Sequence, residues 1–176
     1  MSPLDKSRKF ISINIALLTI SDSRSEENDE SGNLLEQRIL NFGHKVFVRK
    51  IIKDDFKMIK NNILEWSSLK LIDAIIATGG TGLTGRDSTP EAIISISDKI
   101  IDGFGELFRN ISFSKIGTSA LQSRALGALI NETYVFSLPG SKSACKDAWD
   151  NILKFQLDNR YRPCNLIEIM PRLKER

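Results

Sequence analysis

Apolar stretches typical of β-strands alternate along this chain with stretches typical of α-helices. Residues 13–21, INIALLTIS, form a continuous apolar run rich in β-branched residues, which is the pattern of a strand covered on both faces. Similar runs lie at residues 44–52, 70–78 and 133–138. The alternation predicts a three-layer α/β/α fold with a mostly parallel sheet, in which the loops that follow the strands meet along one edge.

The segments between the strands carry helix signals. Residues 31–43 have apolar side chains at helical spacing, with Gly43 placed to end the helix. Residues 54–69 begin with two carboxylates, which are favourable at a helix N-terminus. Further helical segments are predicted over residues 90–100, 102–113, 117–130 and 142–157, before a less regular C-terminal tail.

Length and composition favour one ordinary globular unit. With 176 residues, 41% of them hydrophobic, the chain is long enough to bury a core without disulfides or a structural metal. We expect a single domain over residues 1–176, with its core at about residues 13–158. Two distant cysteines, Cys145 and Cys164, and one histidine, His44, cannot assemble a Cys/His zinc site. We expect both thiols to be buried and His44 to lie on a strand surface.

Charge and hydropathy exclude two classes of partner. The net charge of +3 is a small difference between 25 basic and 22 acidic residues, which gives no reason to expect nucleic acid binding. The apolar run near the N-terminus is far shorter than the ~20 residues of a membrane helix, and no small-residue cleavage site follows it. We expect a cytoplasmic protein without a membrane segment. The acidic run at residues 26–30 is expected to be a solvated loop.

A glycine-rich loop follows the third predicted strand in the sequence IIATGGTGLTGRDSTPEAI, residues 75–93. Residues 80–85 satisfy G-x-G-x-x-G, but these glycines do not open the fold, and Pro90 delays the next helix. In a dinucleotide fold the last glycine would already lie inside that helix. The loop also contains no lysine, which excludes a P-loop. The sequence therefore argues against a nicotinamide or P-loop site.

A third interpretation is an anion-binding loop. Successive backbone N–H groups in a glycine-rich turn bind anions without a lysine, and hydroxyl groups from Thr78, Thr81 and Thr84 add donors. Asp87 follows at once, and its carboxylate suits Mg²⁺ held against phosphates. The alternative is a simple turn in which Asp87 caps the next helix. The predicted phosphate-binding residues of the loop are Thr78, Gly79, Gly80, Thr81 and Gly82.

Two more loops are predicted at the same edge of the sheet. The SDS sequence ends the first strand and either contacts ligand or forms a simple turn. The PGS sequence precedes a helix, whose N–H groups bind anions, although its serine can equally be a plain N-cap. The candidate residues are Ser21, Asp22 and Ser23 in the first loop, and Pro139, Gly140 and Ser141 in the second.

Five motifs in order resemble one known family. TGGTGLTGRDSTPEA, GFGELFR, GTSALQSRA, SLPGS and RPCN together resemble the MoaB/Mog family of molybdenum cofactor biosynthesis proteins. The resemblance runs from about Leu17 to Asn165, nearly the whole chain. GFGELFR and RPCN resemble the bacterial B-type branch. The family implies a three-layer α/β molybdopterin-binding fold and a homo-oligomer, trimeric or hexameric.

The resemblance also implies a reaction and residues for it. Mog-type members transfer AMP from ATP to the terminal phosphate of molybdopterin and release pyrophosphate. The loop from Thr78 to Gly82 would lie against phosphate, and Asp87 would be a catalytic Mg²⁺ ligand. A second essential aspartate matches Asp54, where Lys53 replaces the family's usual proline, and Asp55 is the alternative.

Two further residues follow from the resemblance alone. Ser119 and Arg124 lie in a segment that the family uses near the pterin. The Arg124 guanidinium could bind a phosphate through two hydrogen bonds, or it could form a structural ion pair.

Two functions from different classes remain open. In the first, Asp87 and Asp54 hold Mg²⁺ while the protein transfers AMP from its substrate ATP to its substrate molybdopterin. In the second, the protein is a non-catalytic oligomeric molybdopterin-binding protein of the same pathway. The intact GRDSTPEA sequence favours the enzyme, whereas GFGELFR and RPCN favour the B-type branch. Other molybdenum cofactor biosynthesis proteins are possible partners under either hypothesis.

Overall fold

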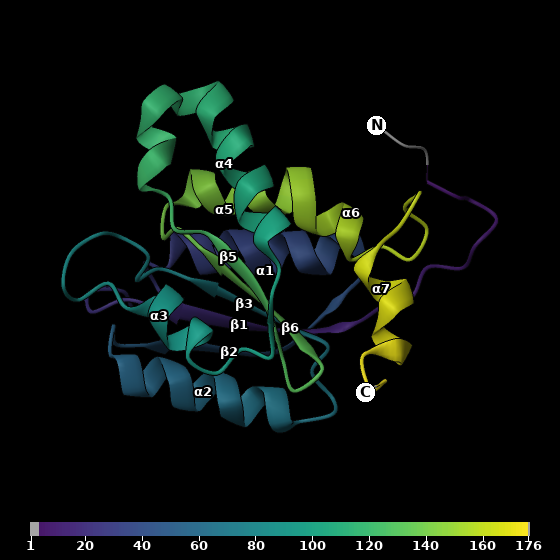
Figure 1. Ribbon diagram of the computed structural model, residues 1–176, viewed down its shortest axis with the longest axis horizontal. Coiled ribbons are helices and arrows are strands. Elements are labelled where there is room, and N and C mark those ends of the chain that lie inside the picture. Colours follow the sequence, from purple (N-terminus) through teal and green to yellow (C-terminus); the bar gives the residue numbers. More distant parts are fainter. Residues whose placement is uncertain (1–3, 176) are drawn as a thin grey trace.

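A six-stranded sheet lies between two layers of helices in the computed structural model, which describes residues 4–175 (Figure 1). The strand order is β2-β1-β3-β6-β5-β4. Strands β2, β1, β3 and β6 run parallel, and β5 runs antiparallel to both of its neighbours. The predicted three-layer, mostly parallel fold is therefore confirmed. The strands are β1 (Asn14–Ile20), β2 (Lys45–Ile52), β3 (Ala74–Thr78), β4 (Lys99–Ile100), β5 (Leu126–Ile130) and β6 (Thr133–Leu138).

Helices α1, α4, α5 and α6 cover one face of the sheet, and α2 and α3 cover the other (Figure 1). A 3-10 helix over Gly117–Gln122 follows α4, a π-helical turn over Trp149–Leu153 joins α5 to α6, and a 3-10 turn over Met170–Arg172 follows α7. The α-helices are α1 (Glu30–Phe42), α2 (Phe56–Ser68), α3 (Thr89–Ile94), α4 (Asp102–Ile116), α5 (Lys142–Ala148), α6 (Lys154–Gln156) and α7 (Leu166–Ile169).

The buried side chains form two clusters, one on each face of the sheet. Successive residues of a strand point to opposite faces, so Leu17 of β1 packs with α1, α4 and α5, while Leu18 packs with α2 and α3. Ile76 and Ile75 of β3 divide in the same way. This two-sided burial is the reason that the central strands read as continuous apolar runs.

Capping residues fix the first two helices close to their predicted bounds. Gly43 ends α1 in the left-handed conformation, with φ 104°, which glycine adopts without a steric cost. Asp55 is the N-cap of α2, and its carboxylate accepts a hydrogen bond of 2.8 Å from the Met58 amide. The predictions of helices over residues 31–43 and 54–69 are confirmed.

Two predicted helical segments are wrong in part. Residues 117–130 begin as the 3-10 helix but end as β5, and residues 90–100 begin within α3 but end as the short strand β4. Strand β5 is held by a two-residue turn at Asn131 and Glu132, both with positive φ (48° and 68°), which pairs β5 with β6 as a hairpin. Pairing with β6 in the hairpin thus overrides the local helical appearance of the Ala- and Leu-containing segment.

Three side chains differ from expectation in their burial. His44 is only 3% exposed, not on a strand surface, and its Nδ1 accepts a hydrogen bond from the Ile13 amide. Burial lowers the pKa of His44 to about 4. Cys145 is buried as expected, but Cys164 is exposed. Asp29, in the acidic run expected to be solvated, is fully buried.

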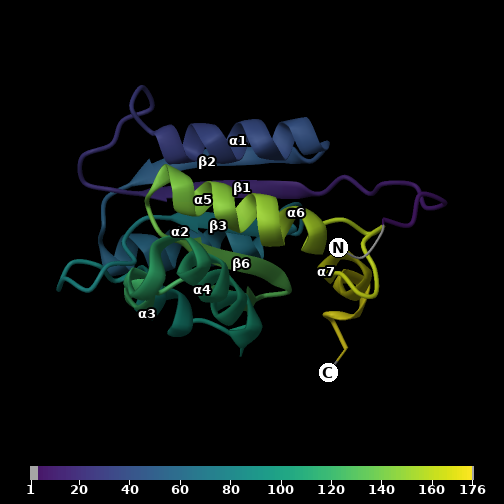
Figure 2. The same cartoon turned by 90° about the horizontal axis from the view of Figure 1, so that it is seen from above.

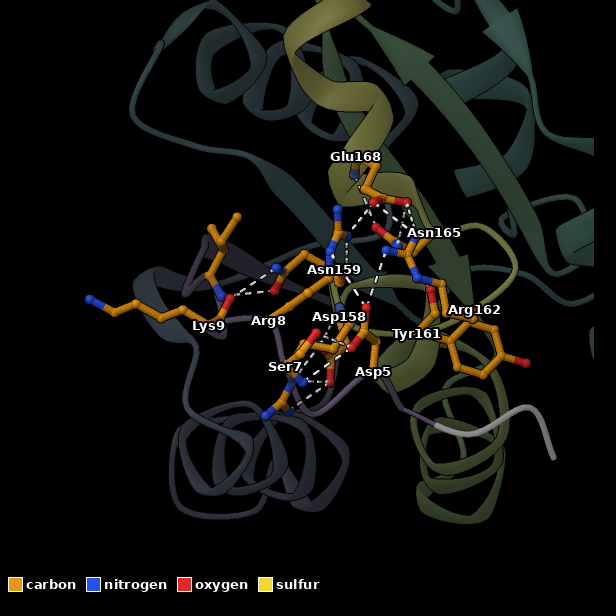
Figure 3. Close-up of polar contacts among 12 residues, drawn as sticks. Asp5, Ser7, Arg8, Lys9, Asp158, Asn159, Tyr161, Arg162, Asn165 and Glu168 are labelled. Carbon is orange, nitrogen blue, oxygen red and sulfur yellow. Dashed lines mark hydrogen bonds and ion pairs between the residues drawn. The ribbon is translucent and has the colours of Figure 1, made fainter.

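The N-terminal segment is bound to the C-terminal tail by a polar cluster, which we call the terminal network (Figure 3). Its members are Asp5, Arg8, Asn159, Arg162 and Glu168. Arg162 lies 3.1 Å from Glu168 and 3.6 Å from Asp5, and Arg8 also pairs with Glu168. The Asn159 amide donates to the Lys9 carbonyl at 3.0 Å and accepts from the Ile11 amide at 2.9 Å. The network closes the amino-terminal edge of the sheet.

Between residues 4 and 175, no helix is long and apolar enough to span a bilayer.

Candidate functional site

The loops that follow β1, β2, β3 and β6 meet at one edge of the sheet, which we call the rim. The rim lies at the carboxyl ends of the parallel strands, opposite the edge that carries the two chain ends (Figures 1 and 2). Ligands of open α/β sheets bind at this edge. The four rim segments are residues 21–29, 53–55, 79–88 and 139–141.

Backbone approaches backbone closely at the start of the glycine loop. Gly79 has φ 103°, and its amide donates to the Leu138 carbonyl at 3.0 Å. A Cβ atom on Gly79 would lie 2.1 Å from the Ile20 carbonyl oxygen, and one on Gly140 would lie 3.4 Å from the Gly79 Cα. A side chain on Gly79 would therefore push apart the ends of β1 and β3.

The next two glycines of the loop, Gly80 and Gly82, pack against carboxylates and not against backbone. A Cβ atom on Gly80, where φ is 62°, would lie 2.8 Å from Asp54 Oδ2. A Cβ atom on Gly82 would lie 2.7 Å from Asp87 Oδ2. The glycine loop is thus packed against two aspartates, one from the end of β2 and one from its own far end.

Asp54 and Asp55 have different neighbours. Asp55 caps α2, whereas Asp54 faces the glycine loop, and its Oδ1 is buried without a hydrogen-bond partner. Burial raises the pKa of Asp54, and the negative charge of Asp87 raises it further. Of the two candidates left open by the sequence, Asp54 is the one placed beside Asp87.

Asp87 is held by the turn that precedes it. Its carboxylate accepts hydrogen bonds from the Thr84 amide at 3.0 Å and from the Thr84 hydroxyl. The hydroxyl bond is the main reason that the pKa of Asp87 is lowered. The N-cap of α3 is Ser88, so the alternative in which Asp87 caps that helix is wrong. A low pKa keeps Asp87 ionised over the physiological range.

The two aspartates fit a magnesium ion that shares its ligands with phosphate and water. No cluster of three or more His, Cys, Asp or Glu side chains suited to a metal occurs in residues 4–175, so the described side chains form no closed metal cage. Mg²⁺ usually binds one or two carboxylates together with substrate phosphates and waters. The unpartnered Oδ1 of Asp54 and the mutual repulsion of Asp54 and Asp87 are both relieved by a cation.

The loop threonines serve the protein itself. The Thr78 hydroxyl is buried, donates to the Pro139 carbonyl at 3.1 Å and lies 3.1 Å from Cys145 Sγ. The Thr84 hydroxyl donates to Asp87, and Thr81 is only 6% exposed. The groups in this loop that remain for an anion are therefore mainly backbone N–H groups.

The SDS loop after β1 is a local turn that also contacts the glycine loop. Ser21 Oγ accepts hydrogen bonds of 3.2 Å from the amides of Ser23 and Arg24. The Asp22 carboxylate pairs with Arg86 at 2.7 Å, which joins the first and third rim loops. Asp22 and Ser23 are exposed.

The PGS loop after β6 is fixed on both sides. Ser141 is the N-cap of α5 and accepts a hydrogen bond of 3.2 Å from the Ala144 amide. The Gly140 carbonyl accepts hydrogen bonds from Arg24 at 2.6 Å and from Ser31 at 2.7 Å. Both serine loops therefore match the turn and N-cap alternatives, and both lie at the rim.

A buried carboxylate that the sequence did not reveal supports this loop. Asp29 accepts hydrogen bonds from the Thr19 hydroxyl at 2.7 Å and from Arg49 at 2.9 Å, and it lies 3.4 Å from Arg24. Burial alone would raise the pKa of Asp29, but the hydrogen bonds from Thr19, Gly32 and Arg49 lower it. Arg24 thus connects a buried ion pair to the PGS loop. Asp29 and its partner Arg49 lie 20 residues apart in the sequence, so no local pattern signalled this ion pair.

Arg124 joins the glycine loop to α3. Its guanidinium donates to the Asp87 carbonyl at 2.8 Å and to the Thr81 carbonyl at 3.2 Å, and it pairs with Glu91. Arg124 thus has the structural ion pair that the sequence left open. Ser119 is exposed on the 3-10 helix.

An open cavity of about 410 Å³ lies beside Asp87. Exposed apolar groups of Phe56 and Leu83 contribute to its wall. The lining residues are Phe56, Leu83, Thr84, Gly85, Asp87, Ser88, Glu91 and Arg124. The rim therefore combines a glycine loop, two carboxylates and a hollow of small-molecule size.

Known proteins are similar to this chain in sequence and in fold. Residues 16–159 match the family described as "Probable molybdopterin binding domain". The chain belongs to this molybdopterin-binding family. Within it, the chain is 45% identical over 159 residues to molybdenum cofactor biosynthesis protein B of Escherichia coli, covering 90% of this chain and 94% of the relative.

Another relative and a solved structure support the same family assignment. The protein of the same name from Bacillus cereus is 45% identical over 138 residues, covering 78% of this chain and 82% of that protein. A crystal structure of a molybdenum cofactor biosynthesis protein B superposes with a TM-score of 0.86 at 38% identity, covering 96% of this chain and all of that one. The predicted membership of the MoaB/Mog family is confirmed.

Proposed function

We propose that this protein acts in molybdenum cofactor biosynthesis by binding molybdopterin at the rim. Its family is described as molybdopterin-binding, and two relatives at 45% identity are named for this pathway. The glycine loop supports the proposal, because its backbone can approach a phosphate group closely. Molybdopterin carries a terminal phosphate of the kind that such a loop binds.

At the rim, the protein would transfer AMP from ATP to molybdopterin. An oxygen of the pterin phosphate attacks the α-phosphorus of ATP, a new P–O–P linkage forms, and the bond to the β-phosphate breaks to release pyrophosphate. The observation that carries this proposal is the pair Asp54 and Asp87 packed against Gly80 and Gly82. A protein that only stored pterin would have little use for two mutually repelling carboxylates beside its phosphate loop.

The chain's own groups would position the reactants rather than exchange protons with them. Backbone N–H groups of Gly80 to Gly82 would hold phosphate, since the Gly79 amide already donates to Leu138, and Asp54 and Asp87 would hold Mg²⁺. Bound magnesium would neutralise charge on the reacting phosphates. Arg124 keeps the far end of the loop in place through the carbonyls of Thr81 and Asp87. Phosphoryl chemistry of this kind depends chiefly on alignment and charge stabilisation.

A direct assay separates this function from the non-catalytic alternative. Purified protein is mixed with metal-free molybdopterin, ATP and Mg²⁺, and the products are analysed by mass spectrometry beside a Mog-type enzyme as positive control. Adenylylated pterin above the no-protein background supports the transferase. Pterin binding without product supports the alternative of a non-catalytic oligomeric molybdopterin-binding protein.

The working unit is proposed to be a cytoplasmic homo-oligomer, trimeric or hexameric. Large apolar side chains on and after α4 are exposed, which is characteristic of surfaces that bind other proteins. Sedimentation velocity would test this assembly. The most exposed of these side chains are Leu107, Phe113, Ile116 and Leu121.

A further inference from the structure

Thr89 lies beside Asp54, although nothing in its motif distinguishes it from an ordinary helix-start residue. It is the first residue of α3 and is fully buried. Its hydroxyl oxygen has no hydrogen-bond partner among the described residues. Buried hydroxyl groups are rarely left unpaired, because desolvation without a partner costs free energy. Two unpartnered oxygens, Thr89 Oγ1 and Asp54 Oδ1, therefore occur in neighbouring residues of the rim.

These oxygens lie against the same residue, Gly80. The point that a Cβ atom of Gly80 would occupy lies 2.3 Å from Thr89 Oγ1, 2.8 Å from Asp54 Oδ2 and 3.0 Å from Asp54 Oδ1. Separations this short show that the Thr89 hydroxyl and the Asp54 carboxylate both pack against the Gly80 backbone, where only glycine leaves room for them. The Thr89 amide donates to the Gly80 carbonyl at 3.0 Å, which fixes the threonine against the loop.

We propose that Thr89 is a third oxygen donor of the magnesium site, an inference that rests on the proposed function. Its hydroxyl and the Asp54 carboxylate, both beside Gly80, together bind one water molecule of the hydrated ion. Mg²⁺ retains several waters in protein sites, and loss of a group in the outer shell of a metal site typically lowers metal affinity about 10- to 100-fold. Because Gly80 has no side chain, the hydroxyl and the carboxylate can both lie this close to the glycine loop.

Thr89→Val tests the inference because it removes the hydroxyl and keeps the branched shape. Mn²⁺ serves as the probe, since it prefers the same oxygen ligands as Mg²⁺. Electron paramagnetic resonance then measures its affinity in the presence of ATP. We expect Thr89→Val to weaken Mn²⁺ binding about tenfold or more. Thr89→Ser, which restores the hydroxyl, should bind Mn²⁺ within about twofold of the unaltered protein.

Thr133→Val is the matched control. Thr133 is also a buried threonine, but its hydroxyl donates to the Ile72 carbonyl at 3.3 Å at the edge away from the rim. We expect this variant to be less stable and to keep full Mn²⁺ affinity. Equal Mn²⁺ affinity of Thr89→Val and the unaltered protein would overturn the inference, as would equal losses in the Val and Ser variants of Thr89.

The Mn²⁺ measurement and the adenylyl-transfer assay test the two proposals separately. If the unaltered protein binds Mn²⁺ with ATP and forms no adenylylated pterin, the adenylyl transfer is wrong, while the variants still test Thr89. If the unaltered protein binds no Mn²⁺ in the presence of ATP, the role of Thr89 is wrong. Turnover in that second case would show adenylyl transfer without this metal site.

Discussion

The rim and the terminal network lie at opposite edges of one sheet, and both are rich in charged groups. In the terminal network each charged group meets an opposite charge, as Arg8 and Arg162 meet Glu168. At the rim, Asp54 and Asp87 repel each other, and oxygens of Asp54 and Thr89 have no partner among the described residues.

The difference separates polar groups that hold the fold from polar groups that are available to a ligand. A satisfied network has already used its hydrogen-bonding capacity within the chain. A buried oxygen without a partner retains an unsatisfied interaction, which a ligand can satisfy. Substitutions at the two edges should therefore affect different measurements, stability at one edge and chemistry at the other.

The largest expected effect is on turnover, in Asp87→Asn. The amide keeps the size of the side chain and loses the negative charge that would hold magnesium, so adenylyl transfer should fall at least about 10²-fold, towards the no-protein background. Molybdopterin binding, followed by fluorescence, should change little. Normal turnover in Asp87→Asn would show that this carboxylate is not a required metal ligand.

Asp29→Asn should cause the largest loss of stability. The change removes the buried charge that accepts hydrogen bonds from Thr19 and Arg49, while Arg49 keeps its pair with Glu36. Hydrogen bonds to a charged group contribute about 1.5–3 kcal/mol each to the free energy of unfolding. Urea denaturation measures the loss. Asp22→Asn is the matched control, because this aspartate of the same loop pairs with an exposed arginine and should cost less than about 1 kcal/mol. Similar losses in both variants would contradict the role of the buried pair.

Asn159→Ala should weaken the terminal network without affecting the rim. It removes the hydrogen bonds to the Lys9 carbonyl and the Ile11 amide, each of which contributes about 0.5–1.5 kcal/mol. Thermal unfolding measures the loss, and Mn²⁺ affinity should remain unchanged. A change in metal affinity would show that the two edges are coupled.

The smallest effect is a stabilisation by Asp54→Asn that depends on pH. The pKa of Asp54 is raised in the folded protein above its ordinary value of 3.8, so its contribution to stability is full below pH 3.8 and is lost as pH rises through the folded-state pKa. The asparagine variant avoids this loss, so without metal it should melt a few degrees higher at pH 7. The difference should vanish towards pH 3.5, and a lower melting temperature at pH 7 would contradict this explanation.

Asp29 should show the opposite pH dependence. Its folded-state pKa is lowered, so its contribution is present above pH 3.8 and is lost as pH falls through the folded-state value.

The sequence predicts the central strands and the first two helices well, because their signals are local. Two-sided burial produces the apolar runs of β1 and β3, and the ends of α1 and α2 are marked by Gly43 and Asp55. Strand β5 escapes prediction because it depends on pairing with β6 across a turn that contains no glycine. Local composition around Ala125 does not distinguish that strand from a helix.

The candidate site is predicted in part for the same reason. The glycine loop and Asp87 lie within one motif, so their proximity is visible in the sequence. Choosing Asp54 over Asp55 needs the helix cap, and finding Thr89 needs the geometry above Gly80. The burial of Asp29 depends on Arg49, which belongs to a neighbouring strand. The metal-binding and catalytic roles of these residues remain predictions.

Because β5 runs antiparallel to β6, the length of the hairpin turn at Asn131 and Glu132 determines where the other end of β5 lies at the rim. Leu126, at the other end of β5, is paired with Ser137. Arg124 precedes Leu126 by two residues in the chain, and its side chain donates to the glycine loop. Turn length sets the register of a hairpin, so one inserted residue would move the Arg124 backbone along β6 by roughly 3.3 Å. A change of length at the edge remote from the rim would then misalign Arg124, which holds the glycine loop through two of its carbonyls.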